Sequence, residues 1–131
     1  MIRVGSQLKI IDNSGGRWGK CISSNKKGRY PSATIGMLIL ISLKKFSNRK
    51  KVNKRILYIG LIVGISYWIS RIDGCFIKFF SNRLLLFNRN LKFLGTRIYG
   101  SILKEIKVKS FAVGKNKKYF QKIFSYSLSI I

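Results

Sequence analysis

The sequence contains very few acidic residues and no histidine. Its 131 residues include 27 Lys and Arg but only three acids, Asp12, Asp73 and Glu105, for a formal net charge of +24. Without histidine, the chain lacks the commonest general base and metal ligand at neutral pH. The three isolated acids offer no acid/base pair, and no Gly-rich loop precedes a Lys-Ser or Lys-Thr pair. These absences argue against an enzyme, including an RNA-modifying one, and against a bound cofactor or metal.

Cysteine is also scarce. The two thiols, Cys21 and Cys75, are far apart in sequence, and neither belongs to a Cys-x-x-Cys pair. With no histidine, a zinc site would have too few ligands. We expect two small buried residues rather than a disulfide, and the pair does not fix a redox compartment.

Long apolar runs are missing as well. The longest covers residues 56–70 and contains two glycines, Gly60 and Gly64. Fifteen residues are fewer than the roughly 20 that a membrane-spanning helix needs. The run is rich in β-branched and aromatic residues, which favour strands. It therefore predicts a strand over 56–69 and no membrane span.

Short strands separated by turn formers are expected over the first hundred residues. The other expected strands cover 4–11, 17–23, 35–43, 75–80 and 83–87. Asp73-Gly74 predicts a hairpin with a type I′ turn. Frequent short strands favour a mainly β fold closed into a small barrel.

One short helix is expected after Gly100, and the rest of the tail is unassigned. Ile102, Leu103 and Ile106 lie on one helical face, and Ser101 is a candidate N-cap. We expect a single domain over 1–131, with the barrel in 1–100 and the helix and tail in 101–131.

Hydrophobic residues make up 47% of the chain, so it is not a disordered basic tail. The positive charge forms three single-sign clusters, whereas solvated faces normally mix signs. This pattern favours a surface that binds phosphates. The clusters contain Arg17, Lys20, Lys26, Lys27 and Arg29; Lys44, Lys45, Arg49, Lys50, Lys51, Lys54 and Arg55; and Lys104, Lys107, Lys109, Lys115, Lys117, Lys118 and Lys122.

Four aromatic residues lie near these clusters: Trp18, Tyr30, Trp68 and Tyr119. Each is suited to stacking on an unpaired base. Ordinary packing against the barrel explains each of them equally well.

Several strings, in order, resemble the universal large-subunit ribosomal protein fourteen family. They begin with Asp-Asn-Ser-Gly at 12–15 and Cys-Ile at 21–22. A central signature runs from Gly-Leu-Ile-Val at 60–63 through Asp73-Gly74 and Phe79 to Asn82. Gly-Thr-Arg-Ile-Tyr-Gly at 95–100 and Phe-Gln-Lys-Ile at 120–123 follow, the latter matching a closing strand. The signature departs mildly at Leu85-Leu86, and 108–119 reads as an insertion.

The resemblance implies a five-stranded β-barrel with a projecting β-ribbon and a short C-terminal α-helix. It also implies large-subunit rRNA as the main partner, large-subunit proteins three and nineteen as neighbours, and a bridge to small-subunit rRNA. A ribosome-silencing factor is expected to dock on Thr96, Arg97 and Lys122, although Arg97 also suits rRNA binding or a turn.

We therefore expect a structural protein that binds rRNA. The divergence from bacterial members and the abundance of residues with A/T-rich codons favour the mitochondrial matrix. A basic β-protein on a membrane surface, using 56–69 as an interfacial strand, is the alternative. The expected rRNA-binding residues are Arg17, Lys20, Lys26, Lys27, Arg29, Lys44, Lys45, Arg49, Lys50, Lys51, Lys54, Arg55, Arg71 and Lys78.

Overall fold

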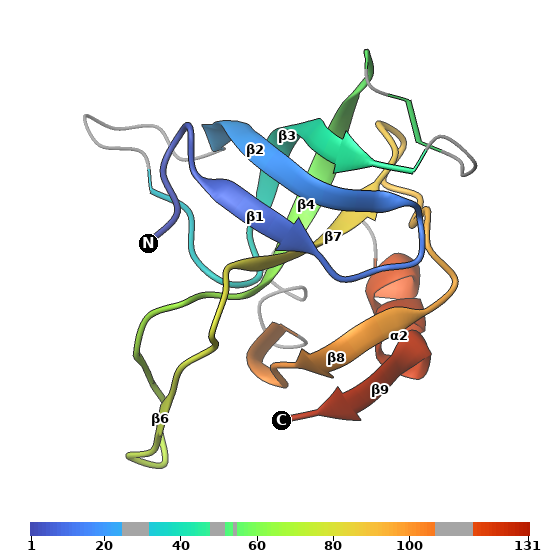
Figure 1. Ribbon diagram of the computed structural model, residues 1–131. Helices are drawn as coiled ribbons and strands as arrows, with labels where there is room; N and C mark the ends of the chain where they lie inside the picture. Colours follow the sequence, from blue (N-terminus) through green and yellow to red (C-terminus); the bar gives the residue numbers. More distant parts are fainter. Residues whose placement is uncertain (25–31, 48–51, 54, 107–116) are drawn as a thin grey trace.

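Five strands close into a β-barrel in the computed structural model, which describes residues 1–24, 32–47, 52–53, 55–106 and 117–131. The barrel order is β1-β2-β3-β4-β7, and the parallel pairing of β1 with β7 closes it, while the other neighbours are antiparallel (Figure 1). The mainly β fold with a five-stranded barrel is therefore confirmed. The strands are β1 (Gln7–Ile10), β2 (Gly16–Ser24), β3 (Leu38–Phe46), β4 (Leu57–Gly64) and β7 (Arg83–Phe87).

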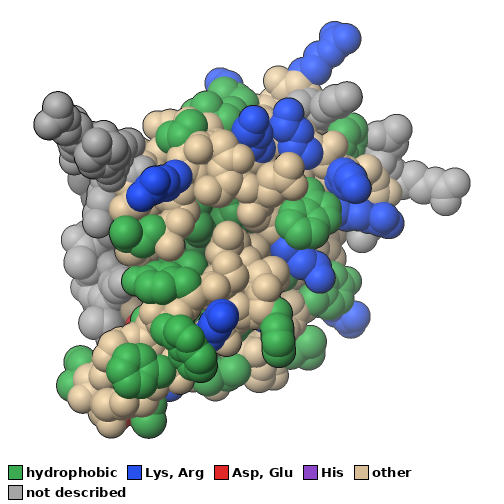
Figure 2. Space-filling view, turned by 60° about the vertical axis from the view of Figure 1, so that its left-hand side comes forward, with side chains coloured by type: hydrophobic (Ala, Val, Ile, Leu, Met, Phe, Trp, Pro, Cys, Tyr) green, Lys and Arg blue, Asp and Glu red, His purple; other side chains and the backbone are tan. Residues whose placement is uncertain are grey.

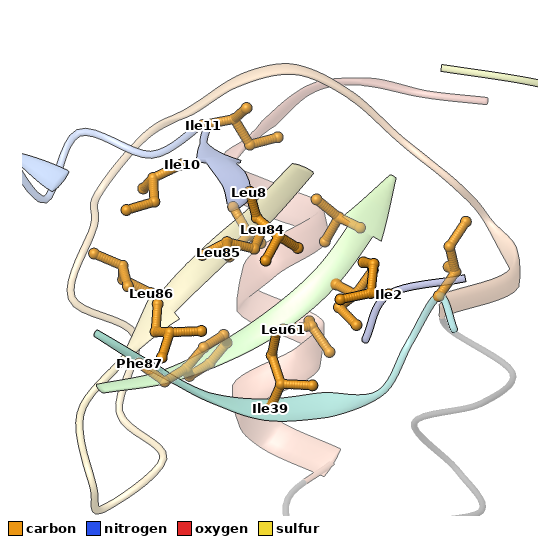
Figure 3. Close-up of a cluster of buried hydrophobic side chains, with 14 of the residues drawn as sticks. Ile2, Leu8, Ile10, Ile11, Ile39, Leu61, Leu84, Leu85, Leu86 and Phe87 are labelled. Atoms are coloured by element: carbon orange, nitrogen blue, oxygen red, sulfur yellow. The ribbon is translucent and has the colours of Figure 1, made fainter. Parts of the chain in front are cut away.

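The barrel is filled by aliphatic side chains from alternate strand positions. Leu8 and Ile10 of β1 are buried while Gln7 and Lys9 are exposed, as period-two alternation requires. Ile39 and Ile41 of β3 are also buried in the core. Figure 3 shows Ile39 in the same cluster as Leu61 of β4 and the side chains of β7. Leu84–Phe87 are all buried, so both faces of β7 are covered.

A two-stranded ribbon, β5 (Ile69–Ser70) and β6 (Phe76–Ile77), projects from the barrel between β4 and β7 (Figure 1). The single strand expected over 56–69 is therefore wrong in its second half, since β4 ends at Gly64. Asn82 fixes the base of the ribbon, because its side-chain oxygen accepts hydrogen bonds from the Ser66 amide at 2.9 Å and the Ser66 hydroxyl at 3.1 Å.

The hairpin expected at Asp73-Gly74 is confirmed, but its turn is not type I′. The Arg71 amide donates to the Cys75 carbonyl at 2.9 Å, which leaves a three-residue loop. Gly74 has φ +80°, and Leu91 is the only non-glycine residue with positive φ in the described chain, so Asp73 does not meet the type I′ requirement. Glycine ends the turn in the left-handed region, as in three-residue hairpins with a bulge.

The C-terminal region packs beside the barrel as β8 (Ile98–Ile102), α2 (Lys117–Tyr126) and β9 (Ser127–Ile130). Strands β8 and β9 pair in parallel (Figure 1). The expected short C-terminal helix is present, but later in the chain than predicted. Ser101 is not an N-cap, because it lies in β8 opposite Ser129. Helical backbone is described only at Glu105 and Ile106 near the predicted site, and 107–116 lie outside the described residues.

Residues 120–123, expected as a closing strand, lie in α2 instead. A four-residue string is too short to separate helical from strand periodicity. Ile102, Leu103, Ile106 and Ile123 are all buried and belong to the same hydrophobic cluster as the barrel core. The suspected insertion at 108–119 falls mostly outside the described residues.

The two cysteines differ in environment. Both are free; Cys21 is buried in β2, whereas Cys75 is exposed on the ribbon. Burial raises the pKa of the Cys21 thiol. The expectation of two buried thiols is therefore correct for Cys21 and wrong for Cys75, which directly follows the hairpin loop of the ribbon rather than lying in a barrel strand.

Among the helices that the structure describes, none combines the length and the apolar character needed to cross a membrane. The first half of the apolar run that raised the question forms the barrel strand β4, in which Leu61, Ile62 and Val63 are fully buried.

Candidate nucleic-acid interface

A buried carboxylate organises the loop after β1. Asp12 accepts hydrogen bonds from the Leu86 amide at 2.7 Å, from the Ser14 amide at 2.9 Å and from the Ser14 hydroxyl. Asp12 also bridges to Ile98 of β8. The acidic side chain thus joins the first loop to β7, while the bridge to Ile98 is made by the backbone. The hydrogen bonds from these donors compensate for the burial of the carboxylate.

The next residue, Asn13, fixes the segment that carries Thr96 and Arg97. Its side-chain oxygen accepts from the Thr96 amide at 2.7 Å and the Arg97 amide at 3.2 Å, while its NH2 donates to the Thr96 hydroxyl at 2.7 Å. Both residues are exposed. The backbone amides of Thr96 and Arg97 are therefore fixed by the Asn13 side chain, and Arg97 is exposed to solvent.

Lys122, the third residue of the expected docking face, is exposed on α2. Tyr126 follows it by four residues, on the same side of the helix. The Tyr126 ring stacks on Phe93 at a centroid distance of 6.2 Å, and Phe93 lies two residues before Gly95. These contacts pack α2 close to the Thr96–Arg97 segment, while a shared docking face for all three residues stays a prediction.

The outer face of β1, β2 and β3 carries Lys and Arg residues near a tryptophan. Lys9 lies directly opposite Trp18, and Trp18 lies directly opposite Lys45 on the other side. Arg17, Lys20 and Lys44 are exposed on the same strands. Figure 2 shows Lys and Arg side chains spread over the upper and right-hand part of one face, with hydrophobic side chains exposed among them.

The remaining predicted rRNA-binding residues have different environments. Arg55 is exposed just before β4, and Lys78 is exposed beyond β6 with its Nζ atom 5.7 Å from the centre of the Trp68 ring. Arg71 is engaged inside the protein, as its guanidinium contacts Glu105 at 2.5 Å and the Ile131 carbonyl at 2.7 Å. Seven others lie outside the described residues: Lys26, Lys27, Arg29, Arg49, Lys50, Lys51 and Lys54.

Two functional candidates were not singled out from the sequence. Lys9 joins the basic face through its pairing with Trp18, and the alternation of Leu8, Lys9 and Ile10 already pointed it outward. Asn13 supports Thr96 and Arg97 from more than 80 positions away. No local pattern in the sequence indicates that contact.

All three acids are accounted for, and none adds negative charge to the outer barrel face. Asp12 is buried, Glu105 is paired with Arg71, and Asp73 is exposed at the far end of the ribbon. Groups of three or more potential metal-ligating side chains are absent from the described residues. The described outer face of β1, β2 and β3 is therefore positively charged.

The ribbon presents a different surface chemistry. Its exposed residues are largely aromatic or aliphatic, and Figure 2 shows hydrophobic side chains gathered at the lower left of that view. The exposed apolar residues of the ribbon and its base are Tyr67, Trp68, Ile72, Phe76 and Phe80.

Comparisons with known proteins agree with these features. A family model described as ribosomal protein L14p/L23e matches residues 1–131. The large ribosomal subunit protein uL14 of Carsonella ruddii (strain PV) is 36% identical over 112 residues, which are 86% of this chain and 92% of that protein. A ribosomal protein family also agrees with the prediction of a non-enzymatic role. The matches confirm the resemblance seen in the sequence: this chain belongs to the ribosomal protein L14p/L23e family.

Proposed function

We propose that this protein is a structural component of a large ribosomal subunit and binds large-subunit rRNA through its basic barrel face and loops. The observation that carries the proposal is the separation of charge. The chain has a net charge of +24, and its three acids are buried, ion-paired or confined to the ribbon. The described barrel strands expose Lys9, Arg17, Lys20, Lys44 and Lys45. Membership of the family and the name of the Carsonella relative support the same assignment.

The mechanism is electrostatic scaffolding. Lys and Arg neutralise phosphates that are forced together in folded RNA, and each contact releases condensed counterions. Backbone contacts fix position and orientation without reading sequence. The barrel contributes rigidity, since β1, β2 and β3 hold Lys9, Lys20 and Lys45 at the spacing of a sheet.

The basic residues between β3 and β4 provide the test. Replacing Arg49, Lys50, Lys51, Lys54 and Arg55 with Gln removes five charges without touching the barrel strands. If all five contact phosphates, the slope of log affinity against log salt falls by about 4, between roughly 0.7 per single-strand contact and roughly 0.9 per duplex contact. A matched control exchanges each Lys for Arg and each Arg for Lys, which keeps the charge and should keep the slope. An unchanged slope in the Gln variant would show that these five Lys and Arg side chains face solvent and do not contact phosphate.

We further propose that Thr96, Arg97 and Lys122 contact a protein partner or small-subunit rRNA. The support is the fixed backbone of Thr96 and Arg97, whose amides donate hydrogen bonds to the Asn13 side chain while both residues stay exposed. The ribosome-silencing factor and an intersubunit bridge are the expected occupants. Arg97→Glu should leave large-subunit assembly mostly intact but reduce subunit joining or factor binding.

Sucrose gradients and a pull-down of the factor measure these effects. Arg97→Lys is the control, and it should restore function only in part, because Lys lacks the planar, bidentate fork of Arg. If Arg97→Glu instead keeps the protein out of large subunits, while subunits that do form join normally, Arg97 belongs to the rRNA-binding surface.

Neighbouring large-subunit proteins, expected to be three and nineteen, complete the proposed assembly. The exposed apolar side chains of the ribbon support a protein contact there, because charged residues are depleted at the centre of such interfaces. We place the protein in mitochondria on the skewed residue usage, and co-sedimentation with mitochondrial ribosomes at moderate salt tests this. Recovery in membrane pellets would favour the membrane-surface alternative.

A further inference from the structure

We infer that Trp18 is a stacking platform for one unpaired nucleotide. The phosphates on either side of that nucleotide are bound by the Lys and Arg side chains near Trp18. This inference rests on the proposed rRNA-binding function and deepens it. It names an unpaired nucleobase, rather than only duplex backbone, as a ligand of the outer barrel face.

The sheet places a cation on each side of the indole ring. In antiparallel pairs, residues directly opposite each other project from the same face of the sheet, about 5 Å apart at Cβ. Trp18 lies opposite Lys9 of β1 and opposite Lys45 of β3, so the three side chains form one row across the strands. Lys9 and Lys45 are exposed, and Trp18 retains 37% of its accessible surface.

Register shifts concentrate further charge at this point. Between Gly16 and Trp18 the pairing skips Arg17, and between Trp18 and Gly19 it skips Lys44 on the facing strand. Such bulges interrupt the alternation of a strand and re-aim side chains. Arg17 and Trp18 are therefore exposed in succession, as are Lys44 and Lys45. Four exposed cations, on three neighbouring strands, therefore lie near Trp18 in the sheet.

Barrel packing does not account for Trp18. The inward positions on either side of it are glycines, and a Cβ on Gly16 would lie 2.7 Å from Ile10 Cδ1. A Cβ on Gly19 would lie 3.3 Å from Ile41 Cδ1. The core beneath β2 is thus already filled by aliphatic side chains from β1 and β3. Trp18 is neither buried in that core nor among the partly buried residues packed against it.

An unpaired nucleotide fits this arrangement through its base and through its phosphates. The base offers an apolar, planar face to the indole ring, and stacking tolerates any base. The phosphates on either side of the nucleotide carry the negative charge that Lys9, Lys45, Arg17 and Lys44 attract. A protein partner would have to be strongly acidic to cover four cations, and duplex RNA would leave the indole face unused.

The second tryptophan supplies a matched control. Trp68 is 60% exposed on the ribbon, with Lys78 near its ring and the apolar Tyr67 and Phe76 exposed on the same ribbon. Removing it deletes the same ring from a surface that lacks the row of cations. The affinity of the full chain is measured for a short oligouridine and for inorganic polyphosphate of equal charge, which has phosphates but no bases.

Trp18→Leu should weaken oligouridine binding by about 5- to 150-fold, the range for loss of one base stack, and leave polyphosphate binding within about twofold. Trp18→Phe should recover most of the loss, and Trp68→Leu should change either affinity little. In a Trp68→Phe protein, oligouridine but not polyphosphate should quench the fluorescence of Trp18, the only tryptophan left.

Equal losses for both ligands would assign Trp18 to stability or to general charge placement and overturn the inference. So would unchanged oligouridine binding, or the absence of base-dependent quenching. If the unmodified chain binds neither ligand, the proposed RNA-binding function itself fails, which is a separate outcome. Strong binding of both ligands that is indifferent to Trp18 would keep that function and reject the platform.

Discussion

Asp12 and Asn13 are adjacent residues that fix different parts of the molecule. Asp12 is directed to β7 through the Leu86 amide, and Asn13 is directed to the exposed Thr96–Arg97 segment. A carboxylate suits the first position because it accepts from the Leu86 amide and from both donors of Ser14, and a carboxamide suits the second because it both accepts and donates. The sequence identified this string by resemblance, whereas the hydrogen bonds explain its chemistry.

A side chain at Gly95 should be unfavourable because other residues approach its backbone closely. A Cβ there would lie 2.8 Å from Phe93 Cζ and 3.1 Å from both Asn13 Oδ1 and Asp12 Cβ. Gly95→Ala should lower the free energy of unfolding by about 1–3 kcal/mol, the usual cost of overpacking.

Urea denaturation measures this change in stability, as a shift of the midpoint with the same m-value in the variant and the unmodified protein. Gly60→Ala is the matched control. Gly60 is also buried in the barrel region, but its Cβ would meet Ile41 and Leu84 at 3.4 Å, an ordinary contact distance. Equal destabilisation by the two variants would contradict the close-approach explanation. Gly100 differs from both, because its φ of +104° is a backbone conformation that favours glycine.

The two thiols should react at different rates. Cys75 is exposed, whereas burial raises the pKa of the Cys21 thiol and lowers its thiolate fraction at neutral pH. A thiol-specific reagent should therefore modify one group per native chain and two after denaturation. Cys75→Ser should abolish the native reaction, and rapid modification of both thiols without denaturant would show that β2 opens readily.

At the scale of elements, the barrel was predictable and the C-terminal region was not. Strand β7 begins and ends where expected, and β2 and β3 are displaced by only a few residues, because alternation and turn residues are local signals. The region after Gly95 depends on contacts with distant strands. The bridge between Asp12 and Ile98 and the pairing of Ser101 with Ser129 override the helical spacing of the intervening aliphatic residues.

The ribbon shows a second limit of sequence patterns. A run of apolar residues from 56 to 70 indicates a strand but not where the strand leaves the barrel. That point is set by Asn82, which binds Ser66, and by Phe79, whose ring packs 3.2 Å from where a Cβ on Gly64 would lie. Both residues belong to the signature that carried the resemblance, and their role as a closure of the ribbon base follows only from the structure.

Arg71 is expected to act between elements rather than on RNA. Its guanidinium joins the ribbon to Glu105 and to the carbonyl of Ile131, and its side chain is only 11% exposed. Arg71→Gln should lower the free energy of unfolding by about 1–3 kcal/mol, because it leaves Glu105 without its charged partner. The salt dependence of RNA binding should stay the same.

Arg55→Gln is the matched control, since Arg55 is an exposed base near the start of β4. This variant should leave stability unchanged and reduce the salt slope by up to roughly one unit. If Arg71→Gln reduces the slope as much as Arg55→Gln does, the Arg71 guanidinium contacts phosphate, and its original place among the rRNA-binding residues is correct.

At the scale of the whole molecule, charge and fold oppose each other. A net charge of +24 on a small domain favours expansion, while the barrel core favours compaction. Since no exposed acid lies on the barrel face, neutralisation has to come from a partner or from salt. The isolated chain at low salt should therefore be only partly folded or prone to aggregation, and a polyanion should complete its folding.

Salt should then act in opposite directions on the free and the bound protein. For the free chain, added salt screens repulsion over about 10 Å at 0.1 M, so the thermal midpoint should rise. With rRNA fragments present, the ligand stabilises the folded state by mass action, but salt weakens that binding, so the increment due to RNA should shrink. Melting curves with and without RNA across a salt series measure both trends. A sharp transition that ignores salt and RNA alike would show that the fold already tolerates its own charge, and the coupling of folding to RNA binding would have to be abandoned.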